Sequence, residues 1–153
     1  MARKTTTPIS IGLNQRKVFI DTGGWMSVEW KDDKYHVPGS TYYRDLLRLR
    51  VQLLTSDYVL DETITRLRRD ARLEIVEACW QRIKEAQKYG YLNVLSVDNS
   101  VRDEAFEILR KYREQTFSFT DCTSFVLAQK EQVDEVFSFD DHFRQFGLII
   151  QPV

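Results

Sequence analysis

The sequence has no long apolar run and few cysteines. No stretch approaches the roughly 20 apolar residues that span a bilayer, and Met1–Thr5 lack the apolar core of a signal peptide. Cys79 and Cys122 are too few for a disulfide framework or a cysteine-based metal site. We therefore expect a cytoplasmic protein without membrane contact, in which both cysteines are reduced.

The sequence also has almost no net charge. Its 22 basic and 23 acidic residues give a net charge of −1. This is not the strongly basic balance of a protein that holds nucleic acid by charge alone. Nucleic-acid enzymes remain possible, because a bound metal ion can supply part of the missing positive charge.

The length of 153 residues suits one domain that buries about two-thirds of its unfolded surface. Residues 1–16 are polar and lack a clear hydrophobic period, so they are predicted to be a lead-in segment, with a short strand at 9–13 as the alternative. Residues 17–153 are predicted to form the folded domain.

The chain is organised around the stretch that begins at Lys17. Val18–Ile20 indicate a short strand buried on both faces. The strand ends at Asp21, and 25–30 follow as a predicted helix. An acid at the carboxyl end of a buried strand lies where open α/β sheets bind their ligands. The alternative is that Asp21 only caps the helix.

Short apolar runs alternate with helically spaced stretches along the rest of the chain. Further strands are predicted at 55–60, 92–97, 133–139 and 147–150. Further helices are predicted at 40–53, 61–88, 100–112, 121–130 and 142–146, and 31–39 are predicted to be a polar turn that ends in Pro38-Gly39. This alternation predicts an α/β fold with a parallel sheet that is covered on both sides.

Four acids stand at the ends of these predicted elements: Asp21, Glu62, Asp121 and Asp140. Because the carboxyl ends of parallel strands meet at one edge, these acids can converge. Carboxylates in one cleft raise each other's pKa, and a divalent cation removes that conflict. Oxygen ligands favour Mg²⁺ or Mn²⁺, and metal-assisted phosphodiester hydrolysis is the chemistry that such a set suits.

Each acid also has a purely structural alternative. Asp21 could be a helix cap, and Glu62 could be a first-turn charge that the helix dipole favours. Asp121 stands at a helix start, where Asp is common, and Asp140 with Asp141 could solvate a turn. The functional interpretation depends on all four occurring together.

Four ordered motifs carry a resemblance to a known family: Asp21–Thr22, Asp57–Thr63, Ser118–Cys122 and Phe137–Phe143. Together they resemble a PIN domain, and more closely the VapC-type ribonucleases of toxin–antitoxin pairs. The resemblance extends from about residue 17 to 150. It implies a single domain with a five-stranded parallel sheet of order 3-2-1-4-5 and helices on both faces. It further implies an Mg²⁺- or Mn²⁺-dependent endoribonuclease, a cognate antitoxin and a homodimer that uses the early helices.

The resemblance also implies roles for individual residues. Asp21 matches the first family aspartate, which binds metal directly or through water. Glu62 matches a glutamate that binds metal or orients water, and Asp121 matches the third acid, at the head of its helix. Asp140 matches the fourth and most variable acid, with Asp141 as a competing candidate.

Three further side chains are secondary candidates for this site. Thr22 and Ser138 could donate hydrogen bonds to the acids or to a coordinated water, and His142 could donate to phosphate. Two features depart from the family pattern: Thr-Gly-Gly follows Asp21, where a serine or another small residue commonly stands in place of the first glycine, and the lead-in of 16 residues is longer than usual.

Arginines on two predicted helices could guide RNA or simply form solvated faces: Arg44, Arg48, Arg50, Arg66, Arg68, Arg69 and Arg72.

The alternatives to an RNA nuclease are a DNA nuclease or phosphatase with the same acids, and a binding module that has lost catalysis.

Overall fold

The computed structural model describes residues 15–153 of the chain. Nearly all of the predicted lead-in at 1–16 therefore lies outside the described residues. Within them, the sheet has five parallel strands in the order β3-β2-β1-β4-β5, which confirms the predicted topology. The strands are β1 (Lys17–Ile20), β2 (Gln52–Ser56), β3 (Leu92–Leu95), β4 (Glu135–Phe137) and β5 (Ile150–Gln151).

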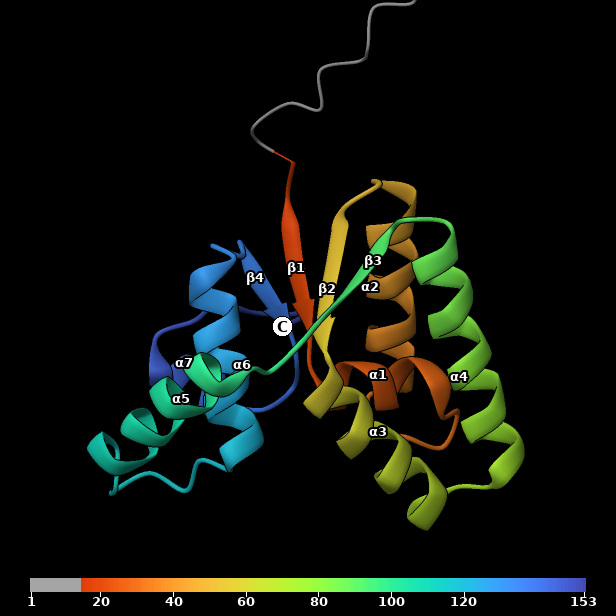
Figure 1. The fold of residues 1–153 in the computed structure, drawn as a ribbon. Coiled ribbons are helices and arrows are strands. Elements are labelled where there is room, and N and C mark those ends of the chain that lie inside the picture. Colours follow the sequence, from red (N-terminus) through yellow and green to blue (C-terminus); the bar gives the residue numbers. More distant parts are fainter. Residues whose placement is uncertain (1–14) are drawn as a thin grey trace, which may run out of the picture.

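Helices cover both faces of this sheet, as predicted. They are α1 (Thr22–Glu29), α2 (His36–Arg48), α3 (Asp57–Asp70), α4 (Leu73–Lys88), α5 (Asn99–Lys111), α6 (Phe119–Lys130) and α7 (His142–Phe146). In Figure 1, α1, α2 and α4 lie to the right of the strands, and α5, α6 and α7 lie to the left. None of these helices in residues 15–153 combines the length and apolar character needed to cross a membrane.

The central strand β1 determines where the site lies. Val18, Phe19 and Ile20 are fully buried, as expected for a strand covered on both faces. The strand pairs with β2 on one side and β4 on the other. The chain leaves the sheet directly after Ile20, where the N–H of Asp21 donates to the carbonyl of Phe137 at 3.1 Å. The ends of β1, β2 and β4 thus meet at one edge.

The second predicted strand was misplaced by about three residues. Residues 57–60 are helical, and the strand ends at Ser56. The hydroxyl of Ser56 accepts a hydrogen bond from the Val59 N–H at 3.1 Å and caps α3. Glu62 consequently lies in the second turn of α3 and does not directly follow a strand. Along α3, Asp61 is exposed, Glu62 is half-buried and Thr63 is buried, so Glu62 lies at the edge of the core, where it lines the cleft.

Two helix predictions were also wrong in their bounds. The single helix predicted at 61–88 is two helices that pack against each other, and the chain leaves the helical conformation at Ala71 and Arg72. Neither residue is a Gly or Pro, so the sequence carries no signal for this break. The helix predicted at 40–53 is α2, which begins at His36, inside the predicted turn at 31–39, and ends at Arg48, so that residues 52–53 belong to β2. Pro38 is tolerated because it stands in the first turn of α2, where a missing N–H costs nothing.

Two glycines allow α1 and α2 to approach their neighbours closely. A Cβ on Gly39 would lie 2.0 Å from the hydroxyl oxygen of Ser27, so α2 could not keep its place on α1. A Cβ on Gly24 would lie 2.5 Å from the carbonyl oxygen of Phe137, so α1 could not keep its place on β4. The Pro-Gly pair therefore marks a close helix contact and not a turn.

Gly24→Ala should lower the free energy of unfolding by about 1–3 kcal/mol, because the new methyl group overpacks the contact with Phe137. Gly23→Ala is the matched control in the same helix. Its Cβ would come no closer than 3.8 Å to the Phe139 nitrogen, so it should keep stability or gain about 0.5–1 kcal/mol. Denaturant unfolding measures both, and equal stabilities would contradict the close approach.

Candidate active site

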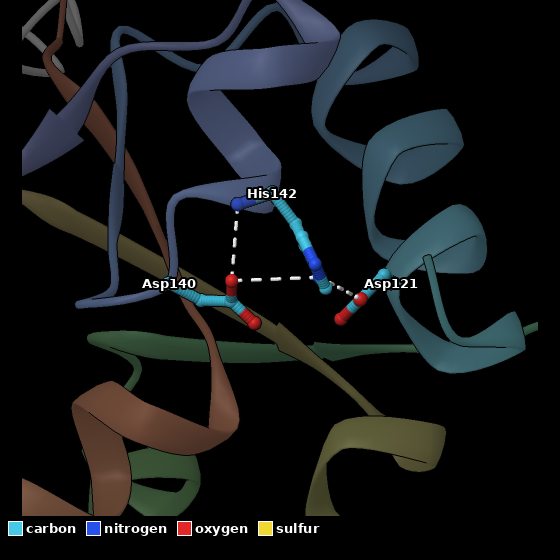
Figure 2. A group of neighbouring side chains, drawn as sticks. All are labelled: Asp121, Asp140 and His142. Carbon is cyan, nitrogen blue, oxygen red and sulfur yellow. Dashed lines mark hydrogen bonds and ion pairs between the residues drawn. The ribbon is translucent and has the colours of Figure 1, made fainter. Parts of the chain in front are cut away.

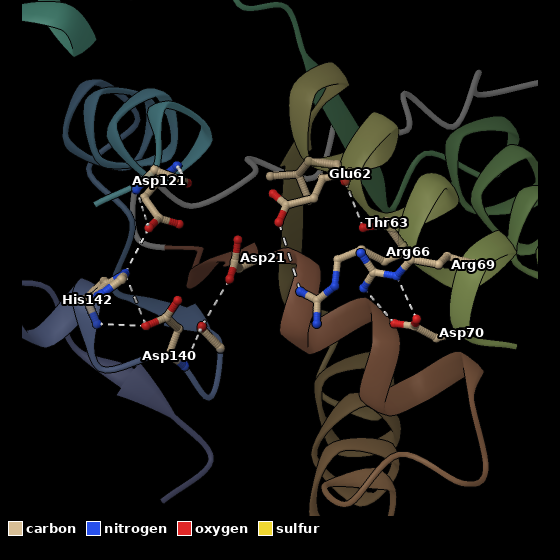
Figure 3. A network of polar contacts seen from close by, with 12 residues as sticks. Asp21, Glu62, Thr63, Arg66, Arg69, Asp70, Asp121, Asp140 and His142 are labelled. Carbon is tan, nitrogen blue, oxygen red and sulfur yellow. Dashed lines mark hydrogen bonds and ion pairs between the residues drawn. The ribbon is translucent and has the colours of Figure 1, made fainter. Parts of the chain in front are cut away.

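A cavity of about 340 Å³ lies at the edge where β1 and β4 end. All four predicted acids line it, together with the secondary candidates Thr22 and Asp141. The parallel sheet thus brings together residues that are up to 120 positions apart in the sequence. Figure 3 shows Asp21 between Glu62 on one side and the pair Asp121 and Asp140 on the other.

Asp21 stands at the position before α1, but its side chain makes no capping hydrogen bond. Its carboxylate instead accepts a hydrogen bond from the Ser138 hydroxyl at 3.1 Å. The residue is only 5% exposed. The geometry therefore argues against a helix cap as the reason for an acid at this position.

Burial and neighbouring acids make Asp21 reluctant to ionise. Burial, the charge of Asp121 and, less, that of Glu62 together raise its pKa to about 7, while hydrogen bonding from the Thr22 backbone and the Ser138 hydroxyl opposes the rise. The pKa of Glu62 is also raised, chiefly by burial, while the Arg66 guanidinium opposes the rise from 3.9 Å. The predicted conflict among carboxylates is thus present in the structure.

Asp121 is fixed at the start of α6 by two partners. It forms a capping box with Ser118, in which the N–H of each residue donates to the side chain of the other at 3.0–3.1 Å. The Nδ1 of His142 also lies 2.9 Å from Oδ2 of Asp121 (Figure 2). Both contacts fall on Oδ2, and within residues 15–153 no hydrogen bond reaches the other oxygen.

His142 links Asp121 to Asp140. Its Nε2 lies 3.2 Å from the Thr116 hydroxyl, so the pair of contacts suits a ring that donates from Nδ1 and accepts at Nε2. Its backbone N–H donates to Oδ1 of Asp140 at 3.0 Å. The Asp140 N–H in turn donates to the Ser138 hydroxyl oxygen at 3.0 Å, which completes a chain of contacts to Asp21.

These residues fit a divalent cation. Single ligand atoms of Asp121, Asp140 and His142 lie within 4.8 Å of one another. The Thr22 hydroxyl oxygen is buried beside Glu62 and lowers the pKa of that carboxyl, but within residues 15–153 it makes no hydrogen bond of good geometry. A buried polar atom without a partner beside several carboxylates is expected where a ligand completes the site.

The structure separates the remaining candidates. Asp141 is mostly exposed and pairs with Arg144 at 3.1 Å, so its geometry suits the fourth-acid role less well than that of Asp140. Cys122 is fully buried and unpaired, and burial raises the pKa of its thiol to about 11, which disfavours a cysteine nucleophile. Of the predicted arginines, Arg66 lines the cavity.

One wall of the cavity consists of residues that were not predicted from the sequence. Lys34 and Tyr35 line it from the connection between α1 and α2, and Phe139 lines it from the end of β4. Lys34 and Tyr35 fall in a stretch that was predicted only as a polar turn. No pattern in the sequence separates these two residues from their polar neighbours, because the contact with Phe139 spans more than 100 residues.

In metal-free protein, Asp21→Asn should raise the free energy of unfolding. Between its ordinary pKa of 3.8 and about 7, the folded protein holds a proton on Asp21 that the unfolded chain has lost. Stability from this group is therefore present at low pH and is lost as the pH rises toward 7. Asparagine removes that loss, which amounts to at most about 4 kcal/mol.

Thermal unfolding in EDTA at pH 5 and pH 8 measures this effect. The gain from Asp21→Asn should be larger at pH 8 than at pH 5. Asp141→Asn is the matched control, because it removes a mostly exposed carboxylate from the same cavity rim. A gain from Asp21→Asn that is no larger at pH 8 would show that burial does not strain this carboxylate.

Comparison with known proteins agrees with the motifs and the fold. The PIN domain family profile matches residues 18–148. The 23S rRNA-specific endonuclease VapC20 of Mycobacterium tuberculosis, from strains CDC 1551 / Oshkosh and ATCC 25618 / H37Rv, is 29% identical over 133 residues, which are 86% of this chain and 95% of the relative.

Two solved structures are similar over most of their length. The crystal structure of Mycobacterium tuberculosis VapC20, described as a sarcin–ricin loop cleaving toxin, has a TM-score of 0.73 and 25% identity and covers 86% of this chain and 96% of its own. VapBC2 from Rickettsia felis, bound to a DNA fragment from its promoter, has a TM-score of 0.62 at 14% identity, with 88% and 97% covered, and so shows likeness of fold alone. The chain belongs to the PIN domain family.

Proposed function

We propose that this PIN domain protein is a divalent-metal-dependent endoribonuclease and the toxin of a toxin–antitoxin pair. The observation that carries the proposal is the single cavity that collects Asp21, Glu62, Asp121 and Asp140 at one edge of the sheet. The similarity to a 23S rRNA-specific endonuclease and sarcin–ricin loop cleaving toxin supports it. An RNA hairpin of the sarcin–ricin type is therefore the first substrate to test.

Asp21, Asp121 and Asp140 would hold the metal ion, with Glu62 as a further ligand directly or through water. Carboxylate oxygens suit Mg²⁺ or Mn²⁺. When bound, such a cation lowers the pKa of a coordinated water and stabilises negative charge on phosphate oxygens during hydrolysis. The proton that Asp21 retains up to about pH 7 competes with the cation, so binding should strengthen as the pH rises through that value.

The other residues of the cavity would position these acids. The Ser138 hydroxyl holds Asp21 and the Asp140 backbone together, and His142 holds Asp121 and Asp140 together. Glu62 stands across the cleft on α3 and would accept a hydrogen bond, and then a proton, from the attacking water. Burial raises the pKa of this carboxyl above its ordinary value, which makes it a stronger proton acceptor.

Two partners belong to this proposal. A cognate antitoxin is inferred, because the relative VapC20 is described as a toxin. A homodimer that uses the early helices is inferred from the family resemblance. Light scattering of the purified protein tests the dimer, and co-expression with the product of an adjacent small gene tests the antitoxin.

Asp121→Asn should abolish tight Mn²⁺ binding and lower RNA cleavage by about 100-fold or more, because a missing ligand forfeits several kcal/mol of charge stabilisation. Calorimetry with Mn²⁺ and cleavage of a labelled RNA hairpin measure the two effects. Asp98→Asn is the matched control, because Asp98 also caps a helix through its side chain but lies outside the cavity lining.

The same assay separates the other functions. Cleavage of flap DNA or of a small phosphate ester, with RNA left intact, would replace the ribonuclease by a DNA nuclease or phosphatase. Mn²⁺ binding without cleavage of any of the three would indicate a binding module. Equal cleavage by the parent, Asp121→Asn and Asp98→Asn would refute a catalytic role for this cavity.

His142→Ala should weaken Mn²⁺ binding by about 10- to 100-fold, because residues that orient metal ligands have effects of this size. His142→Asn should lose less, since its amide can donate near the position of Nδ1 and keep Asp121 in place. Calorimetry at fixed pH measures both variants. Equal affinity in the parent and His142→Ala would show that the capping box alone fixes Asp121.

A further inference from the structure

One wall of the cavity differs in chemistry from the acids. Lys34, Tyr35 and Phe139 line it and carry no negative charge, and the neighbouring carboxylate of Asp33 accepts a hydrogen bond from the Tyr35 N–H. The Tyr35 ring lies parallel on the Phe139 ring, with centroids 4.2 Å apart and an angle of 0°. The Lys34 ammonium lies 4.7 Å from the centroid of Tyr35. The three side chains thus form a stack, which we call the Lys34–Tyr35–Phe139 stack.

The protein holds this stack in place without a ligand. The Tyr35 N–H donates to the Asp33 carboxylate at 2.8 Å, and the Tyr35 carbonyl accepts from the Gly39 N–H at 2.9 Å. The next residue, His36, is fixed by a 2.7 Å contact between its Nδ1 and the Ser27 carbonyl. Phe139 packs edge-on against the buried Phe137. The wall is therefore preorganised, which reduces the entropy that a bound partner must overcome.

Lys34 is the cation of this cavity that is free to meet an anion. Lys34 and Arg66 are the two cations in the lining, and Arg66 lies 3.9 Å from Glu62 on the same helix. Lys34 is exposed and, within residues 15–153, takes part in no ion pair. An anionic strand that approaches a cluster of carboxylates needs such a cation beside it.

We propose that Lys34, held on the Tyr35–Phe139 ring pair, binds a backbone phosphate of the nucleic-acid strand next to the scissile bond. This proposal rests on the proposed ribonuclease function and adds a subsite to it. A phosphate suits the geometry better than a base, because Phe139 already stacks on Tyr35 and the Lys34 ammonium lies over the same ring. Lysine binds phosphate as a point charge, and the ring beneath it limits the positions of its long stem.

The test compares two lysines of the same connection. Lys34→Gln and Lys31→Gln change the net charge equally, but Lys31 is exposed and does not line the cavity. Steady-state cleavage of one RNA hairpin with Mn²⁺ is measured at several salt concentrations. Lys34→Gln should raise KM about 3- to 10-fold and leave kcat within about twofold, because it removes binding that the ground state and transition state share.

The salt dependence identifies the contact as a phosphate. Loss of one phosphate contact should reduce the slope of log(kcat/KM) against log[salt] by about 0.7 on a single-stranded segment. Lys31→Gln should leave the slope as in the parent. Tyr35→Phe should behave like the parent, and Tyr35→Leu should weaken binding in the same direction as Lys34→Gln.

Each outcome decides the proposal. If the parent cleaves RNA and the two lysine variants share one KM and one slope, the Lys34 subsite is wrong and the ribonuclease function stands. If Tyr35→Leu raises KM while Lys34→Gln leaves the slope unchanged, the wall stacks on a base and the phosphate assignment is wrong. If the parent neither cleaves nor binds the RNA in an anisotropy titration, both the function and the subsite fall. If it binds without cleavage, the same comparison of slopes is made on the binding constants.

Discussion

Repulsion among carboxylates is the constraint on which this structure depends. Asp21 is buried at the end of the central strand, and the charges of Asp121 and Glu62 act on it in addition to burial, which together raise its pKa to about 7. An arrangement of this kind costs stability in the metal-free chain and is tolerated where a site requires it. The rest of the fold holds the acids close together in spite of that repulsion.

The parallel sheet brings the acids to one edge, and local hydrogen bonds fix the positions of their carboxylates. Because β1 and β4 are neighbours, Ser138 can bond both Asp21 and Asp140. α6 begins with a capping box that fixes Asp121, and α7 brings His142 against it. Each acid is therefore held by a different element, and no single helix or loop carries the site.

Apolar runs and helical spacing were sufficient for the α/β class and the bounds of α7, and the resemblance to the PIN family supplied the sheet order, which the structure confirms. The sequence was insufficient for the element bounds that tertiary contacts determine. Nothing in Ala71–Arg72 marks the break between α3 and α4, and Pro38-Gly39 looked like a turn although Gly39 marks a contact with Ser27. Asp21 and Asp140 were found because each follows a recognisable strand. Glu62 and Asp121 lie in the first turns of α3 and α6 and were found as acids of the family motifs, whereas the hydrogen bonds around all four were not predicted.

The Lys34–Tyr35–Phe139 stack shows why the missing part of the site matters. A chain with a net charge of −1 has no overall attraction for nucleic acid, and its cleft concentrates negative charge. A metal ion can offset the charge at the reacting phosphate, but the neighbouring phosphates still face the carboxylates. In the proposed subsite, Lys34 on its aromatic pair would offset that repulsion at one phosphate. A generally basic surface would also offset it, but would not select a position along the strand. In the proposed nuclease, the cleft would combine acids that hold the metal with a cation that binds the strand.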